Sequence, residues 1–129
     1  AVAWIDATRT LDPRDFIDVD AAGRDALWVV RPGDPARAAW CADLLLRTGA
    51  FALVVLDGAP VLSRNIAVRL SQLTRDADAA LLLLGDGPKA SEIGGALRLV
   101  LKRRPARDTR GGPQVAALIE KGGPHQLVP

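Results

Sequence analysis

The sequence predicts an α/β fold with a mostly parallel central sheet, flanking helices and a C-terminal antiparallel strand pair. Two features lead to this prediction. Short apolar runs typical of buried strands alternate with longer amphipathic segments over most of the chain, as in parallel sheets whose strands are joined by helices. Beyond Gly95 the pattern becomes an alternation of polar and apolar residues, which indicates strands with one solvated face.

Composition sets broad limits on what the protein can be. The chain has 129 residues, close to half of them apolar, which is enough for one domain with a real core. The net charge of +2 does not by itself favour an acidic or a nucleic-acid partner. A single cysteine, Cys41, excludes an internal disulfide and fits a reducing compartment. No apolar run reaches the roughly 18 residues of a membrane helix and no signal peptide is recognisable, so we expect a cytoplasmic protein.

The first two strands are predicted from short apolar runs. Ala1 to Ala7 forms the first, and Asp12 and Pro13 then suit the N-cap and first position of a short helix. The run Ala26 to Val30 is bounded by charged residues and predicts a second buried strand.

Two amphipathic helices and two further strands follow. Asp34 as N-cap, Pro35 in the first turn and Gly49 as the terminating residue delimit the first of these helices. Its apolar face is formed by Ala38, Ala39, Ala42, Leu45 and Leu46. Phe51 to Asp57 is the third strand. The second helix, within Leu62 to Asp78, precedes the fourth strand; its apolar stripe comprises Ile66, Leu70 and Leu73, with Arg64, Arg69 and Arg75 toward water.

The C-terminal part is predicted to form a hairpin. Leu97, Leu99 and Leu101 alternate with Arg98, Val100 and Lys102, and Pro113 to Gly123 is the expected partner strand. We expect this hairpin to extend the parallel sheet in the antiparallel sense. Since no domain boundary is recognisable, residues 1–129 are predicted to form a single domain.

The order of four motifs carries a family resemblance. The stretches "WIDATRTLDP", "LVVLD", "LLLLGD" and "GGALRLVLKRR" resemble the core of the RecA family from the strand after the phosphate-loop helix onward. The segment "LWVVRPGDPARAAWCADLLLRTGAFALVVLDG" is similar in particular to the ImuA group, RecA-like accessory proteins of bacterial translesion mutagenesis that are related to SulA. The resemblance implies a RecA-like core, and we expect the chain to be a fragment that lacks an upstream N-terminal strand and helix.

The resemblance also assigns the catalytic positions. Asp57 matches the Walker B carboxylate of ATP-hydrolysing relatives; the alternative is a polar strand end. Thr8 stands where the family has its catalytic Glu, and a hydroxyl cannot usefully accept a proton from water. The fourth strand ends in Leu84, Gly85 and Asp86, without the family's Gln. We therefore predict no catalytic residues and no cofactor, with ATP and Mg²⁺ as the alternative.

A basic run near the hairpin is the second candidate site. It consists of Lys102, Arg103, Arg104, Arg107 and Arg110. These side chains are suited to bind nucleic acid or a protein partner, and the alternative is a solvated rim. The only histidine, His125, has no cysteine or carboxylate cluster around it, so no metal site is predicted. Trp4 and Trp28 are expected in the core or on the sheet face, and Trp40 is expected to face a partner.

Three functions are compatible with these residues. The resemblance implies a non-catalytic adaptor in SOS-induced translesion DNA synthesis. Its partners would be an ImuB-like polymerase-type protein, an error-prone DNA polymerase and RecA itself, with weak or indirect DNA binding. The first alternative is a RecA-like DNA-dependent ATPase whose phosphate loop lies upstream of this chain. The second is a SulA-like cell-division inhibitor.

Overall fold

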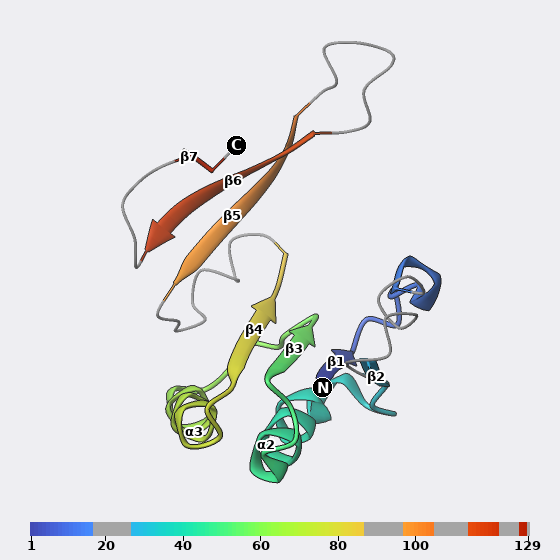
Figure 1. The fold of residues 1–129 in the computed structure, drawn as a ribbon, viewed down its shortest axis with the longest axis vertical. Coiled ribbons are helices and arrows are strands. Elements are labelled where there is room, and N and C mark those ends of the chain that lie inside the picture. The colour runs from blue at the N-terminus through green and yellow to red at the C-terminus, as the bar shows by residue number, and fades with distance from the viewer. Residues whose placement is uncertain (17–26, 87–96, 105–113, 122–126, 129) are drawn as a thin grey trace. The chain divides into compact units, whose positions relative to one another are not determined.

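The computed structural model describes residues 1–16, 27–86, 97–104, 114–121 and 127–128 (Figure 1). Contacts within the chain define two compact units, Ala1–Gly94 and Gly95–Pro129, which are described one at a time. The single-domain assignment of residues 1–129 stays a prediction.

The first unit contains a parallel four-stranded sheet with the strand order β2-β1-β3-β4. Its strands are β1 (Val2–Asp6), β2 (Leu27–Val30), β3 (Leu53–Asp57) and β4 (Ala80–Leu84). Its helical elements are the 3-10 helices η1 (Pro13–Phe16) and η2 (Pro35–Arg37) and the α-helices α2 (Ala38–Thr48) and α3 (Arg64–Asp76). The predicted α/β class and parallel sheet are confirmed.

Local sequence signals explain where the helices begin and end. The carboxylate of Asp34 accepts a hydrogen bond from the N–H two residues further on at 2.9 Å, and Ser63 caps α3 by accepting from the N–H of Ile66 at 3.4 Å. Gly49 ends α2 with φ 65°, and its N–H donates to the carbonyl of Leu46 at 3.1 Å. Glycine adopts this left-handed conformation without strain.

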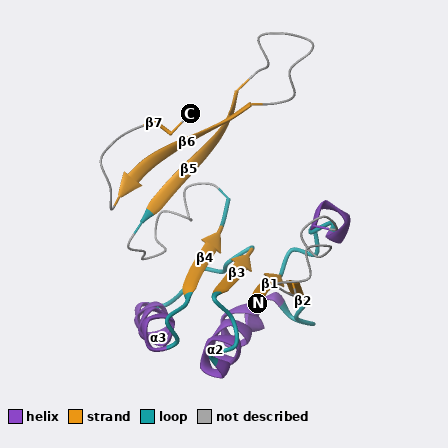
Figure 2. Cartoon of the chain, in the orientation of Figure 1, coloured by secondary structure: helices purple, strands orange, loops and turns teal. Residues whose placement is uncertain are grey.

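Helices α2 and α3 lie on the same face of the sheet (Figure 2). Between them and the sheet lies the core, whose buried residues include Ala3, Ile5, Val54, Leu56, Ala38, Ala42, Leu46 and Leu70. Cys41 packs against this core as a small apolar residue. The predicted apolar stripe of α3 needs one correction: Leu70 is buried, but Ile66 is exposed because it lies at the margin of the helix–sheet contact.

The connection from β1 to β2 runs across the sheet in the direction opposite to the two later connections. Because crossovers between parallel strands are right-handed, we expect η1, in the described part of this connection, on the face without α2 and α3. The rings of Trp4 on β1 and Phe16 in η1 accordingly lie 5.5 Å apart. Trp28 lies on the sheet face, one of its two expected positions, and is 57% exposed because β2 is an edge strand.

The second unit is an antiparallel sheet of β5 (Arg98–Arg104), β6 (Gln114–Lys121) and β7 (Leu127–Val128), in that order. The predicted hairpin is confirmed. Within this unit β6 pairs with β5 on one side and with β7 on the other, and the extension of the parallel sheet by the hairpin stays a prediction. The alternating pattern specifies the faces of a strand but not its neighbours.

The buried strand β3 should be far more sensitive to truncation than the edge strand β4. Leu56 is 0% exposed and Leu82 is 43% exposed. We expect Leu56→Ala to lower the free energy of unfolding by about 2–5 kcal/mol, through lost burial and a cavity. The matched change Leu82→Ala should cost less than about 1 kcal/mol. Urea unfolding followed by circular dichroism measures both, and equal losses would contradict this core.

Candidate functional site

The carboxyl edge of the parallel sheet is where this topology favours a ligand site. The chain leaves β1 toward one face of the sheet and leaves β3 toward the other. In open α/β sheets, ligands bind in the crevice outside the carboxyl ends of two such neighbouring strands. Asp6 and Asp57 are the last residues of β1 and β3 and lie opposite each other in the strand register. The site is therefore built around these two carboxylates.

Asp6 is fully buried and holds several donors. Its Oδ2 accepts from Nε of Arg31 at 2.9 Å. Its Oδ1 accepts from the N–H of Thr10 at 3.0 Å and from the hydroxyl of Thr8 at 3.3 Å. Both oxygens of the carboxylate are thus engaged by the protein itself.

Arg31 connects the turns that follow β1 and β2. Besides Asp6, it binds the carbonyl of Leu11 through Nη2 at 2.9 Å. A second link comes from Arg9, whose Nη2 donates to the carbonyl of Pro32 at 3.4 Å. Arg9 adopts φ 59°, an uncommon value for a residue other than glycine, so the turn after β1 keeps a strained shape within these contacts.

The environment of Asp6 favours its charged form. Burial on its own raises the pKa of the carboxyl, because a buried charge loses its hydration. Hydrogen bonds from Arg31 and from the backbone of Thr10 and Leu11, together with the charge of Arg31, outweigh burial and hold the pKa below its usual value of 3.8. A carboxylate stabilised in this way is a poor proton acceptor for catalysis near neutral pH.

Asp57 lies where the sequence predicts it, at the end of a buried strand. It is half-buried, and its Oδ2 accepts from the indole Nε1 of Trp4 at 3.3 Å. Its backbone carbonyl accepts from the N–H of Ala7 at 3.2 Å, which prolongs the pairing of β1 and β3 beyond the strands. These contacts are those of a polar strand end; the vestigial Walker B role stays a prediction.

Thr8 is exposed and lies beside Gly58 at the carboxyl edge of the sheet. Gly58, directly after β3, has φ 72°, and a Cβ atom placed there would collide with the Cγ2 methyl of Thr8. The Thr8 hydroxyl faces the other way, toward Asp6, and lies 2.7 Å from that of Thr10. Thr8 therefore orders the turn through its hydroxyl and contacts Gly58 through its methyl.

Sequence reasoning missed three members of this site, namely Trp4, Thr10 and Arg31. One signal could have pointed to Arg31. An aspartate at the end of a buried strand needs a cation or several donors, because a buried charge without them is very costly. Arg31 directly follows β2, which pairs with β1, so it was the nearest cation at the same edge of the sheet.

The basic run is only partly within the described residues. Lys102 and Arg103 are exposed on β5, opposite Ala116 and Val115 of β6. Successive residues of a strand point to opposite faces, so these two cations do not share one patch. Arg104 is the last residue of β5, and Arg107 and Arg110 lie outside the described residues. The proposed nucleic-acid or partner contact of this run stays a prediction.

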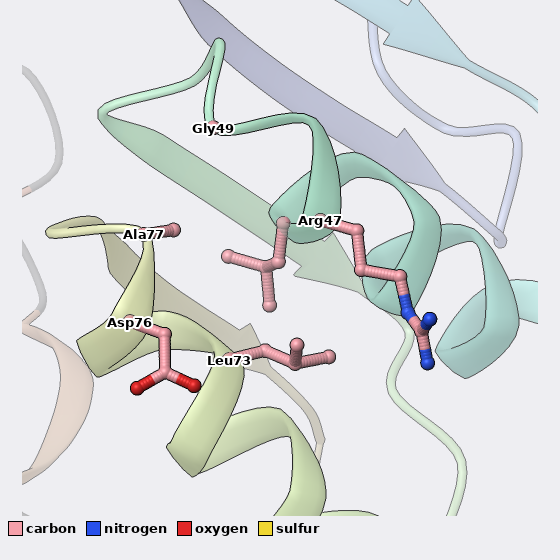
Figure 3. Close-up of a pocket in the computed structure, with 6 residues that line it drawn as sticks. Arg47, Gly49, Leu73, Asp76 and Ala77 are labelled. Atoms are coloured by element: carbon pink, nitrogen blue, oxygen red, sulfur yellow. The ribbon is translucent and has the colours of Figure 1, made fainter.

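A cavity of about 230 Å³ lies between the C-terminal ends of α2 and α3 (Figure 3). It is lined by Leu46, Arg47, Gly49, Leu73, Asp76 and Ala77. In Figure 3 the guanidinium of Arg47 and the carboxylate of Asp76 point away from each other. Because a ligand site needs polar groups that converge, this cavity is better explained as an imperfect helix–helix contact.

Within the described parts of the chain, no three His, Cys, Asp or Glu side chains are grouped as a metal would require. Among those same residues, no helix has the length and apolar character needed to cross a membrane. No protein-family model matches the chain, and no curated protein matches it significantly.

The link between Asp6 and Arg31 should stabilise the fold in a pH-dependent way. We expect Arg31→Met to lower the free energy of unfolding by about 1.5–3 kcal/mol near neutral pH, because a buried carboxylate loses a charged hydrogen bond. The folded pKa of Asp6 lies below the usual 3.8, so its stabilisation is present above that pH and is lost as the pH falls through the folded pKa. The difference between wild type and R31M should therefore shrink in acid.

Urea unfolding at a series of pH values from neutral into acid tests this prediction. The matched control is Arg47→Met, which removes an exposed partner of Asp43 and should cost less than about 1 kcal/mol. Equal losses of unfolding free energy in the two variants would contradict the role assigned to Asp6 and Arg31. So would a loss in R31M that does not change with pH.

The contact between Thr8 and Gly58 can be isolated with a second glycine. Gly49 and Gly58 both have positive φ, but no atom lies within 4 Å of a Cβ at Gly49. Gly49→Ala should cost about 1–2 kcal/mol from conformation alone, and Gly58→Ala should cost about 1–3 kcal/mol more because of the methyl of Thr8. Adding Thr8→Ser to G58A should recover most of the excess in urea unfolding; no recovery would refute the contact.

Proposed function

We propose that this chain is a non-catalytic, RecA-like adaptor in SOS-induced translesion DNA synthesis. The observation that supports this proposal is the state of the crevice between β1 and β3. Thr8 lies against Gly58, and both oxygens of Asp6 accept hydrogen bonds from Arg31, Thr10 and Thr8. The carboxylate at the place where this topology favours a substrate is therefore engaged by the protein's own groups.

The chemistry of the crevice also favours a scaffold over a hydrolase. Activation of water for attack on a phosphate needs a positioned group that orients the water or takes its proton. Asp6 is stabilised as a carboxylate by Arg31, and Thr8 offers only a hydroxyl. Without such a group the rate of hydrolysis falls by orders of magnitude, whereas the buried strands retain their stability.

The partners of the adaptor follow from the resemblance to ImuA. They are an ImuB-like polymerase-type protein, an error-prone DNA polymerase and RecA itself. A rigid α/β core suits such a role because its surfaces are ordered before they bind, which lowers the entropic cost of association. Weak or indirect DNA contact is proposed for the basic run that includes Lys102 and Arg103.

A DNA-dependent ATPase is the second candidate, and Asp57 is the observation that favours it. Its carboxyl group stands at the end of the buried strand β3, as a Mg²⁺-binding Walker B carboxylate would. The contact with the Trp4 indole is long at 3.3 Å, so it is weak enough for a nucleotide-bound state to replace it.

The two candidates make opposite predictions for Asp57→Asn in the full-length protein. For the adaptor we expect stable co-purification with at least one of the three partners, unchanged in D57N, and phosphate release at the level of the buffer with or without single-stranded DNA. A brisk, DNA-stimulated release that D57N reduces by two or more orders of magnitude, on the scale of lost catalytic groups, would establish the ATPase instead. Failure to bind any of the partners would refute the adaptor.

A further inference from the structure

The outward face of α2 carries a stripe of apolar and cationic side chains. Arg37, Trp40, Leu44 and Arg47 recur at helical spacing and are all exposed, Trp40 by 55% and Leu44 by 43%. The opposite face of α2 packs into the core, so the orientation of the helix is determined and the stripe faces solvent. We call these four residues the α2 stripe.

Trp40 is held in place by its neighbour. The guanidinium carbon of Arg37 lies 5.5 Å from the centroid of the indole ring, within range of a cation–π interaction. An aromatic side chain that is ordered before binding loses less entropy when a partner covers it. Tryptophan and arginine are also the residue types that contribute most often to binding hot spots.

The α2 stripe itself carries two cations and no acidic side chain. The one acidic residue of α2, Asp43, is turned toward α3, where it accepts from Arg47 at 2.8 Å and from Arg69 at 2.6 Å with only 14% of its side chain exposed. Burial raises its pKa, but the two arginines outweigh burial and lower it, so Asp43 stays ionised within this cluster. From Asp34, the N-cap of η2, to Thr48 there are two arginines and two aspartates, and Arg69 of α3 adds a third cation at Asp43.

We propose that the α2 stripe is the docking surface for an acidic segment of a partner protein that also carries apolar side chains. The apolar side chains would cover Trp40 and Leu44, and the carboxylates would meet Arg37 and Arg47. The inference rests on the proposed adaptor function and adds the surface and the chemistry of the partner. Charge complementarity of this kind sets both the choice of partner and the rate of association.

Other occupants fit this surface less well. A symmetric dimer through the α2 stripe would place the same cations against each other, since a twofold interface brings identical patches together. A nucleic acid would satisfy Arg37 and Arg47 but would leave Leu44 against phosphates, and single strands need several stacking aromatics where the stripe has one. The apolar centre between two cations fits an amphipathic acidic peptide.

Selection from a random peptide display library tests the proposal without assuming a sequence. The full chain is the bait, and the Trp40→Ala chain is used for counter-selection, with peptides of about 16 residues, long enough to lie along α2 as a helix. We expect the enriched peptides to be acidic and to contain apolar residues. Enrichment of basic or uncharged peptides would overturn the proposal. So would a selection in which no enriched peptide needs Trp40 for binding.

Binding constants of the best peptide then test the chemistry. Measured by fluorescence anisotropy, the affinity for the peptide should fall roughly tenfold or more in Trp40→Ala and in the double variant Arg37→Glu/Arg47→Glu. Changing the acidic residues of the peptide to lysine should abolish binding to wild type and restore binding to R37E/R47E. This exchange can succeed only if the variant is folded, so it separates a lost contact from a lost structure.

Matched controls lie on α3. Val68→Ala removes an exposed apolar side chain, and Arg64→Glu/Arg75→Glu makes the same change in charge as R37E/R47E. Both should bind the peptide as wild type does. If the α3 charge variant weakens peptide binding as much as R37E/R47E does, the loss comes from the net charge of the protein and not from contacts at the α2 stripe, and the proposal is refuted.

The remaining outcomes identify a different occupant or separate this inference from the proposed function. Self-association that analytical ultracentrifugation detects and W40A abolishes would assign the surface to a second copy of the chain. Duplex DNA that competes with the peptide and needs Trp40 for binding would assign the surface to nucleic acid. Either result overturns the proposal.

If polymerase-type partners bind but W40A and R37E/R47E do not weaken their binding, the docking surface is refuted and the adaptor stands. If acidic peptides bind through Trp40 and none of those partners does, the adaptor is refuted and the surface stands.

Discussion

The buried carboxylate of Asp6 places the strongest constraint on this structure. It ends a central strand at a point where water cannot reach it, so the fold is stable only if the protein supplies charge and hydrogen bonds in place of water. Arg31 and the turn from Thr8 to Thr10 provide them. The same contacts join the turns after β1 and β2, so the shape of the whole carboxyl edge depends on this one group.

That constraint also bears on function. In α/β proteins the crevice between oppositely connected strands is useful because the backbone turns away and leaves space. Here Asp6 binds the turn after β1 through Thr8 and Thr10, and the methyl of Thr8 lies against Gly58. A site that satisfies its own charges gains stability and loses the unsatisfied groups that would bind and activate a substrate.

The docking surface that we propose lies instead on the outward side of the helical layer. Asp43 again acts through arginines, since it draws Arg47 and Arg69 together between α2 and α3. Since two arginines share that one carboxylate, the cluster keeps one net positive charge beside Trp40 and Leu44. The two acidic residues thus have related effects: one joins the turns of the carboxyl edge, and the other holds Arg47 of the α2 stripe beside α3.

The sequence by itself determined the local elements: the alternation of strands and helices, the caps at Asp34 and Gly49, the hairpin of β5 and β6, and the place of Asp57 at a strand end. These follow from periodicity and from residues that act on their nearest neighbours. Only the tertiary structure decided that Asp6 pairs with Arg31, that Thr8 meets Gly58, that Trp28 is exposed and that β7 pairs with β6. Each depends on which distant segment lies alongside, and hydrophobic periodicity specifies the face of an element without specifying its partner.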